Sequence, residues 1–95
     1  MLRIERSANG QVVFTLSGRM QTEDIEQFQQ LLLIEAPGQL LMIDLRDLML
    51  ANRDAVCFLA NCETDGIKLE NCPLHIRSWI DREKRRNSAR RRRKS

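Results

Sequence analysis

The stretch from Leu40 to Leu45 is the feature that most narrows the possible folds of this chain. Five of its six residues are aliphatic or Met, and the run is too short for an ordinary globular helix. A run of this kind is typical of a strand that is buried on both faces of a sheet. Because such strands belong to sheets covered by helices, the run predicts an α/β domain.

Turn and capping signals before this run predict a hairpin and a helix. Asn9-Gly10 favours a tight turn between strands at about residues 2–7 and 11–16, because both residues tolerate a positive φ. Thr22 is expected to cap the helix, which should end near Glu35, where a Pro-Gly pair follows. The first third of the domain is therefore predicted to be β-β-α.

Similar signals continue after the run. Asn52 is a good N-cap for a second helix, and Gly66 is placed to end it. A short strand is expected at residues 67–69, and Pro73 suits the first turn of a third helix. The predicted order is β-β-α-β-α-β-α, which gives one small domain with a mixed four-stranded sheet and helices packed against it.

Charge divides the chain into two parts. Residues 1–80 hold 7 basic and 11 acidic side chains, whereas residues 81–95 hold 9 basic and 2 acidic ones, which together give the net charge of +3. We therefore expect a folded domain over residues 1–81 and a basic, disordered tail over residues 82–95. Any long-range attraction to polyanions is expected to come from this tail.

Catalytic and metal-binding patterns find little support. Cys57, Cys62 and Cys72 form no CxxC pair, and they are interpreted as small buried side chains in a reducing cytoplasm. A zinc site built from Cys62, Cys72 and His75 is the less favoured alternative, since the usual ligand spacings are missing. No signal peptide or membrane span is expected, and we predict a cytoplasmic protein without enzymatic activity, cofactor or metal.

Three segments in order resemble the STAS family, the domain shared by anti-sigma factor antagonists and the tails of sulfate transporters. The first is Leu16-Ser17-Gly18, which closes the second strand before a capped helix. The second is Ile43–Leu48, which looks like the family's LDL-x-x-V strand, and the third is the Gly, strand and helix of Gly66–Ile80. The resemblance covers about residues 2–80 and implies the STAS fold.

The family's regulatory loop reads D-S-S-G, and its first Ser accepts a phosphate from a kinase. The matching residues here are Asn52, Arg53, Asp54 and Ala55. Arg53 stands at the phosphoacceptor position and has no hydroxyl, so a phosphoryl switch at this residue is not expected. A plain helix cap would account for Asn52 and Asp54, but it leaves Arg53 unexplained, because a cation is unfavourable near a helix N-terminus.

The resemblance implies a regulatory domain that binds another protein, such as a kinase-like anti-sigma factor or a larger signalling assembly. The expected partner-binding residues are Asn52, Arg53, Asp54 and Ala55. Many STAS domains continue with a further strand and helix, whereas the pattern here fades near Ile80. We therefore expect an exposed sheet edge or helix face that a partner, or a second copy in a homo-oligomer, could cover.

The alternative function is nucleic-acid binding through the tail, by release of counterions from the phosphate backbone. The residues expected to carry it are Arg90, Arg91, Arg92, Arg93 and Lys94. No aromatic side chains lie among them for base stacking, and a solvated, disordered end is the plainer interpretation.

Overall fold

The computed structural model describes the backbone of residues 1–94 and the side chains of residues 1–86. It confirms the α/β class and the predicted elements but adds a strand, so the expected count of four strands is wrong. The elements are β1 (Leu2–Asn9), β2 (Gln11–Met20), α1 (Thr22–Ile34), β3 (Leu41–Asp44), β4 (Leu48–Ala51), α2 (Arg53–Thr64), β5 (Lys68–Glu70) and α3 (Leu74–Lys94).

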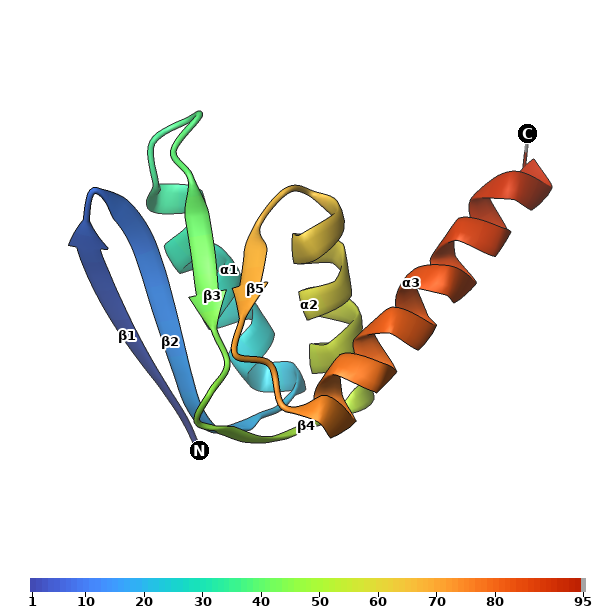
Figure 1. Ribbon diagram of the computed structural model, residues 1–95, viewed down its shortest axis with the longest axis horizontal. Coiled ribbons are helices and arrows are strands. Elements are labelled where there is room, and N and C mark those ends of the chain that lie inside the picture. The colour runs from blue at the N-terminus through green and yellow to red at the C-terminus, as the bar shows by residue number, and fades with distance from the viewer. Residues whose placement is uncertain (95) are drawn as a thin grey trace.

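The sheet has the strand order β1-β2-β3-β5, and β4 also pairs with β2. β1 and β2 are antiparallel, while β3 runs parallel to both β2 and β5. Figure 1 shows α1 and α2 together on one face of this sheet, and α3 leading away from it. The sheet is therefore mixed, as predicted, and its helices cover one face.

The additional strand, β4, depends on a change in the course of β2. Residues 12–15 of β2 pair with β3, and residues 18–20 pair with β4, with a register shift between Gly18 and Arg19 that leaves Met49 of β4 without an opposite residue. Gly18 has a φ of +94°, and a Cβ on it would lie 2.5 Å from the Met1 carbonyl oxygen. Only glycine fits both requirements. The four-residue β4 escaped prediction because an apolar run before a capped helix also suits a lead-in to that helix.

The core lies between the sheet and the helices α1 and α2, and Ile76 and Ile80 in the first part of α3 also belong to it. Phe28 of α1 packs edge-to-face against Phe14 of β2, with ring centroids 5.5 Å apart. The prediction that the Leu40–Leu45 run is buried on both faces is wrong. Ile43 and Leu45 are fully buried, but Met42 is half-buried and Leu40 is 73% exposed. The cause is the open face of the sheet, which the helices leave to solvent.

The two helix starts differ in how well they could be predicted. Asn52 caps α2 as expected, since its Oδ1 accepts from the Ala55 N–H at 2.9 Å. At α1 the cap is Gln21 rather than Thr22, and the Gln21 N–H donates to the Asp24 carboxylate at 2.9 Å. Because the Thr22 hydroxyl does not cap α1, it can form hydrogen bonds with another part of the chain.

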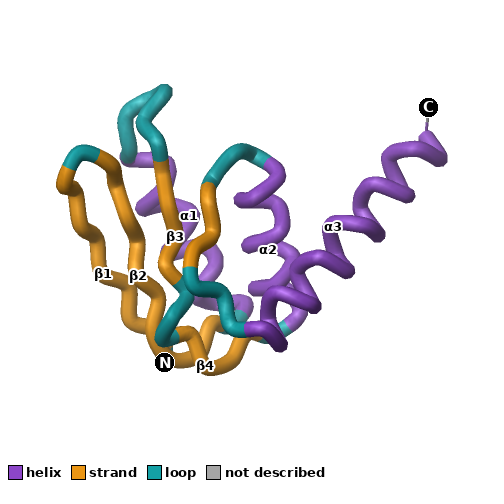
Figure 2. Tube along the Cα trace, viewed as in Figure 1, coloured by secondary structure: helices purple, strands orange, loops and turns teal. Residues whose placement is uncertain are grey.

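The third helix is longer than expected. α3 continues through Lys94, so the backbone of residues 82–94, within the tail expected to be disordered, is helical, and residue 95 lies outside the described residues (Figure 2). Glu83 is only 4% exposed, and Lys84 Nζ lies 2.9 Å from Glu63 Oε1 on α2. Contact between α2 and α3 thus extends past the domain boundary expected at residue 81. Within the described residues, no helix combines the length and apolar character that crossing a membrane requires.

Candidate functional site

The N-cap and the first two residues of α2, which we call the junction (Asn52, Arg53 and Asp54), follow directly after β4 and are fixed to the sheet and to α1. The Asn52 N–H donates to the Met20 carbonyl at the end of β2, at 3.1 Å. The same residue caps α2 with its side-chain oxygen. Its backbone and side chain are therefore both occupied, and its conformation is set by the core strand β2.

Thr22 connects the two outer residues of the junction. Asn52 Nδ2 donates to Thr22 Oγ1 at 3.0 Å, and the Thr22 hydroxyl donates to Asp54 Oδ2 at 2.7 Å. Thr22 lies 30 residues or more before its partners in the sequence, so no local sequence pattern predicts the contact. Capping propensity assigned this side chain a different role, and the sequence-based prediction of the site missed it.

Among the three junction residues, Arg53 differs in that its side chain has no hydrogen-bond or ion-pair partner among the described side chains. Arg53 is exposed. It is also the first residue of α2, where the partial positive charge of the helix N-terminus disfavours a cation. Local stability does not explain an arginine at this position.

Ala55 does not belong to the exposed surface. Its side chain is fully buried in the core, and its N–H is used by the Asn52 cap. The prediction that Ala55 contacts a partner is therefore wrong for its side chain. The exposed junction residues that remain are Asn52, Arg53 and Asp54.

Large apolar side chains are exposed next to the junction. Met49 and Leu50 of β4 are 69% and 54% exposed, and Leu74 at the start of α3 is 84% exposed. His75 Nε2 lies 3.4 Å from the Met49 carbonyl oxygen, which brings the start of α3 beside β4. Met and Arg are both enriched in protein interfaces relative to the rest of the surface.

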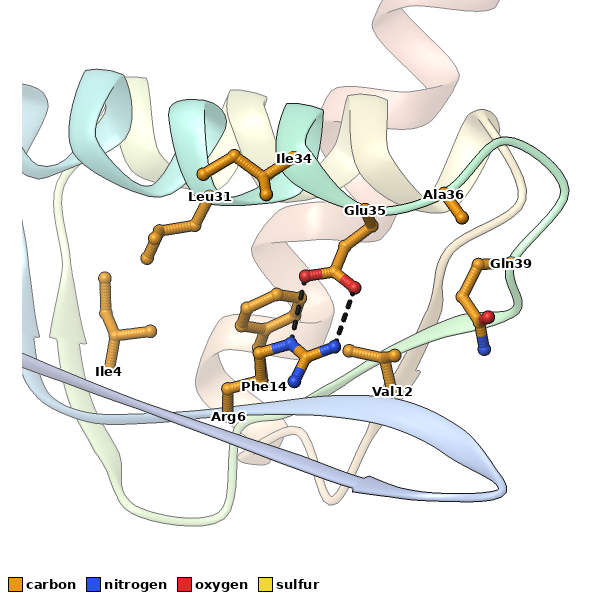
Figure 3. Close-up of a pocket in the computed structure, with 9 residues that line it drawn as sticks. All are labelled: Ile4, Arg6, Val12, Phe14, Leu31, Ile34, Glu35, Ala36 and Gln39. Carbon is orange, nitrogen blue, oxygen red and sulfur yellow. Dashed lines mark hydrogen bonds and ion pairs between the residues drawn. The ribbon is translucent and has the colours of Figure 1, made fainter.

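A pocket of about 630 Å³ lies at the other end of α1 and is the second candidate site (Figure 3). Its walls are mainly apolar side chains of β1, β2 and α1, among them Ile4, Phe14 and Leu31. Arg6 spans it to Glu35 with two hydrogen bonds of 3.0 Å. This hydrogen-bonded pairing lowers the pKa of Glu35 and raises that of Arg6. The acid and the base neutralise each other, so neither is free for proton transfer.

The cysteines have the character of structural thiols. Burial raises the pKa of Cys62 to about 12 and also raises the pKa of Cys57 and of Cys72. Cys57 Sγ donates to Glu83 Oε2 at 3.4 Å, which further favours the protonated thiol. Reactive cysteines need the thiolate, so these environments oppose nucleophilic chemistry. Nowhere in the described residues do three His, Cys, Asp or Glu side chains gather as metal ligands.

The architecture is a SpoIIAA-like fold, which is the fold of STAS domains, and the predicted resemblance is confirmed at the level of fold. A search of solved structures finds the crystal structure of an uncharacterized protein from the DUF3478 family, with a SpoIIAA-like fold, from Shewanella loihica PV-4. The two share 18% sequence identity with a TM-score of 0.54, over 72% of this chain and 64% of that chain. No family model matches the sequence, and no curated protein matches it.

The residues predicted for nucleic-acid binding stand apart from both sites. Arg90, Arg91, Arg92, Arg93 and Lys94 belong to the last part of α3, and their side chains lie outside the described residues. Their role stays a prediction from the sequence.

Proposed function

We propose that this protein is a regulatory protein–protein interaction domain that acts without catalysis. Its contact surface consists of the junction and the exposed apolar side chains beside it, Met49, Leu50 and Leu74. The partner is a protein with an acidic group that pairs with Arg53 and an apolar patch that covers β4.

The observation that carries this proposal is the contrast within the junction. Three hydrogen bonds fix Asn52, Thr22 and Asp54, whereas the Arg53 side chain between them is exposed and unpaired among the described side chains. A rigid backbone that carries a free guanidinium loses little conformational entropy on binding, and arginine is enriched among residues that dominate interface energies.

The residue type at position 53 supports one kind of regulation over another. In the STAS family, the position that matches Arg53 by resemblance is a phosphoacceptor serine. Phosphorylation would add about two negative charges there. Arg53 gives the surface a constant positive charge instead. Binding would then be controlled by the amount of the partner or by competition for it, and not by a phosphate at this residue.

The test is quantitative affinity capture from extract of the native cell, with the wild-type chain, Arg53→Glu and a matched control, Lys68→Glu. Lys68 is exposed at the start of β5, at the opposite end of the parallel strands from the junction. We expect at least one protein to be captured by wild type and by Lys68→Glu but lost with Arg53→Glu. Equal capture by all three chains would contradict the proposal.

The alternative, nucleic-acid binding through the tail, is separated by salt. Tail binding to duplex DNA should weaken with a log–log slope of about −0.9 per phosphate neutralised. Replacing all five residues, Arg90, Arg91, Arg92, Arg93 and Lys94, with Gln should abolish this binding and leave Arg53-dependent capture unchanged. Capture of nucleic acid alone, lost with these replacements, would favour the alternative.

A further inference from the structure

β1 forms an open edge of the sheet. This strand is eight residues long, and within the described chain its strand partner is β2, on one side. β5, at the other edge, has three residues. Long exposed edge strands present unpaired backbone groups that can pair with another chain. β1 is therefore the edge that offers a surface for strand addition.

The hydrogen bonds of β2 show which backbone groups of β1 are free. The N–H groups of Val12 and Gly18 donate away from β1, to Leu40 and Asp47, whereas the Arg19 N–H donates to Met1 of the β1 side. Arg19 stands opposite Met1 in the continued register that pairs Leu2 with Gly18. Since bonded and non-bonded pairs alternate in antiparallel sheets, odd-numbered residues of β1 bond to β2. The even-numbered residues, centred on Ile4, direct their N–H and C=O groups to the open edge.

Opposite charges alternate along the face of β1 that points away from α1. Arg3 and Glu5 lie on this face and form an ion pair of 3.1 Å within the strand, with 78% and 58% of their side chains exposed. Charged side chains on an edge usually prevent pairing, because like charges then meet. Here the register of pairing decides whether like or opposite charges face each other, since Arg3 and Glu5 are opposite in charge and two residues apart.

Only one symmetric register places these opposite charges across from each other. An antiparallel pair of β1 strands centred on Arg3, Glu5 or Arg6 sets that residue against its own copy, which is a like-charge contact. Centring on Ile4 sets Arg3 against Glu5 of the second copy, and Glu5 against Arg3. These are non-hydrogen-bonded positions, where opposite side chains approach most closely.

We propose that two copies of this chain pair through β1 in antiparallel orientation, with Ile4 opposite Ile4 of the second copy. The outward N–H and C=O groups of Ile4 then bond to each other, and those of Leu2 bond to those of Arg6. The two sheets become one continuous sheet with all helices on the same face.

The side chain of Ile4 supports the same register. Ile4 is half-buried and forms part of the wall of the pocket between β1, β2 and α1 (Figure 3). Pairing at this residue brings a second isoleucine against it. The seam therefore has an apolar pair on the helix-covered face and two ion pairs on the other, which is the cross-strand pattern that stabilises sheets.

The first test is a charge exchange followed by sedimentation equilibrium of the full-length chain. Arg3→Glu and Glu5→Arg each create like charges across the seam, and each should raise the dimer dissociation constant about tenfold or more. The double variant, Arg3→Glu with Glu5→Arg, restores both ion pairs and should return within about threefold of wild type. Circular dichroism confirms that each variant is folded.

The second test measures the register by oxidative crosslinking. Ile4→Cys should form a disulfide dimer, since hydrogen-bonded partners have Cα atoms about 5.5 Å apart. Glu5→Cys should not, because its copies lie on a diagonal about 7–8 Å apart. The wild-type chain under the same oxidant controls for Cys57, Cys62 and Cys72.

The outcomes decide the proposal directly. A wild-type chain that stays monomeric at every concentration overturns it, as does a dimer that neither single charge reversal weakens. A dimer that crosslinks through Glu5→Cys and not through Ile4→Cys overturns the register. Rescue by the double variant together with crosslinking at residue 4 supports both the surface and the partner.

Discussion

The two ends of α2 carry polar clusters of opposite character. At its start is the junction, where Thr22 joins Asn52 and Asp54 through neutral and singly charged hydrogen bonds. At its end is what we call the α2–α3 ionic cluster, made of Glu63, Arg77, Asp81 and Lys84. Arg77 donates two hydrogen bonds to Glu63, of 2.6 and 2.9 Å, and Lys84 adds a third of 2.9 Å.

The difference lies in what happens to the charges. In the ionic cluster every charge has a partner, since Arg77 also reaches Asp81 at 2.6 Å. At the junction the polar groups hold one another while the cation beside them, Arg53, stays exposed. At the end of α2, ion pairs help to hold α3 against the domain. At its start, the Arg53 guanidinium stays exposed and can contact another molecule. Substitutions at the two ends should therefore differ in what they damage.

The largest effect on stability is expected from Glu63→Ala. It leaves Arg77 and Lys84 without their shared, part-buried acceptor, and losing such charge-assisted bonds costs about 1–3 kcal/mol. Urea denaturation followed by circular dichroism measures the change. Glu26→Ala, an exposed glutamate of α1, is the matched control and should stay within about 0.5 kcal/mol of wild type. Equal effects at both positions would remove the distinction between the two ends of α2.

Acid should weaken the same cluster. The bidentate hydrogen bonds from Arg77, opposed by partial burial and helped by Lys84, lower the pKa of Glu63 from 4.5 to about 2. Its contribution to stability is present above pH 4.5 and is lost as the pH falls from 4.5 through 2. With solvent screening this amounts to about 1–2 kcal/mol. Glu35, whose pKa Arg6 lowers, acts in the same direction.

Unfolding of wild type and Glu63→Gln, measured from neutral pH down to acid, checks this expectation. The variant should lose less stability than wild type over that range, because it no longer has the carboxylate. Parallel curves for the two chains would show that Glu63 does not titrate as described.

A smaller effect is expected from Asn52→Ala at the junction. It removes the cap of α2 and the bond to Thr22, and loss of an N-cap costs about 1 kcal/mol. Thermal unfolding measures the loss, and Asn52→Asp should recover most of it, since aspartate caps equally well. If Asn52→Ala destabilised the chain as much as Glu63→Ala, the junction would be as important for folding as the ionic cluster.

The smallest effect on stability is expected from Arg53→Ala. Its side chain is exposed, so the free energy of unfolding should change by less than about 0.5 kcal/mol. Capture of the partner, in contrast, should fall. A clear loss of stability with unchanged binding would reverse the roles assigned to the two ends of α2.

The fold was largely predictable because its signals are local. The Asn9-Gly10 turn, the Asn52 cap and the glycine at residue 66 each mark a boundary within a few residues. Burial was harder to predict. The Leu40–Leu45 run is apolar whether one or two of its faces are covered, and only the placement of α1 and α2 decides this.

The candidate site was predictable only in part. Asn52, Arg53 and Asp54 follow from one short stretch, and the structure places all three at the surface. Ala55 was included by adjacency, although the helix turns its side chain into the core. Thr22 was missed because its contact is made across the fold. The length of α3 was missed because the apolar stripe fades at Arg82 and the charged residues after it were expected not to pack.

The course of β2 has a consequence for how the domain opens. β2 pairs with β1 along one side and with β3 and then β4 along the other, so neither of its sides is free. Its amide hydrogens should be among the last to exchange with solvent, and only when the whole domain unfolds. The Asn52 N–H bonds to the end of this strand. The junction should therefore keep its conformation through local fluctuations of the loops and lose it only when the whole domain unfolds. Under the proposed function, the fraction of chains able to bind a partner should then follow the folded fraction.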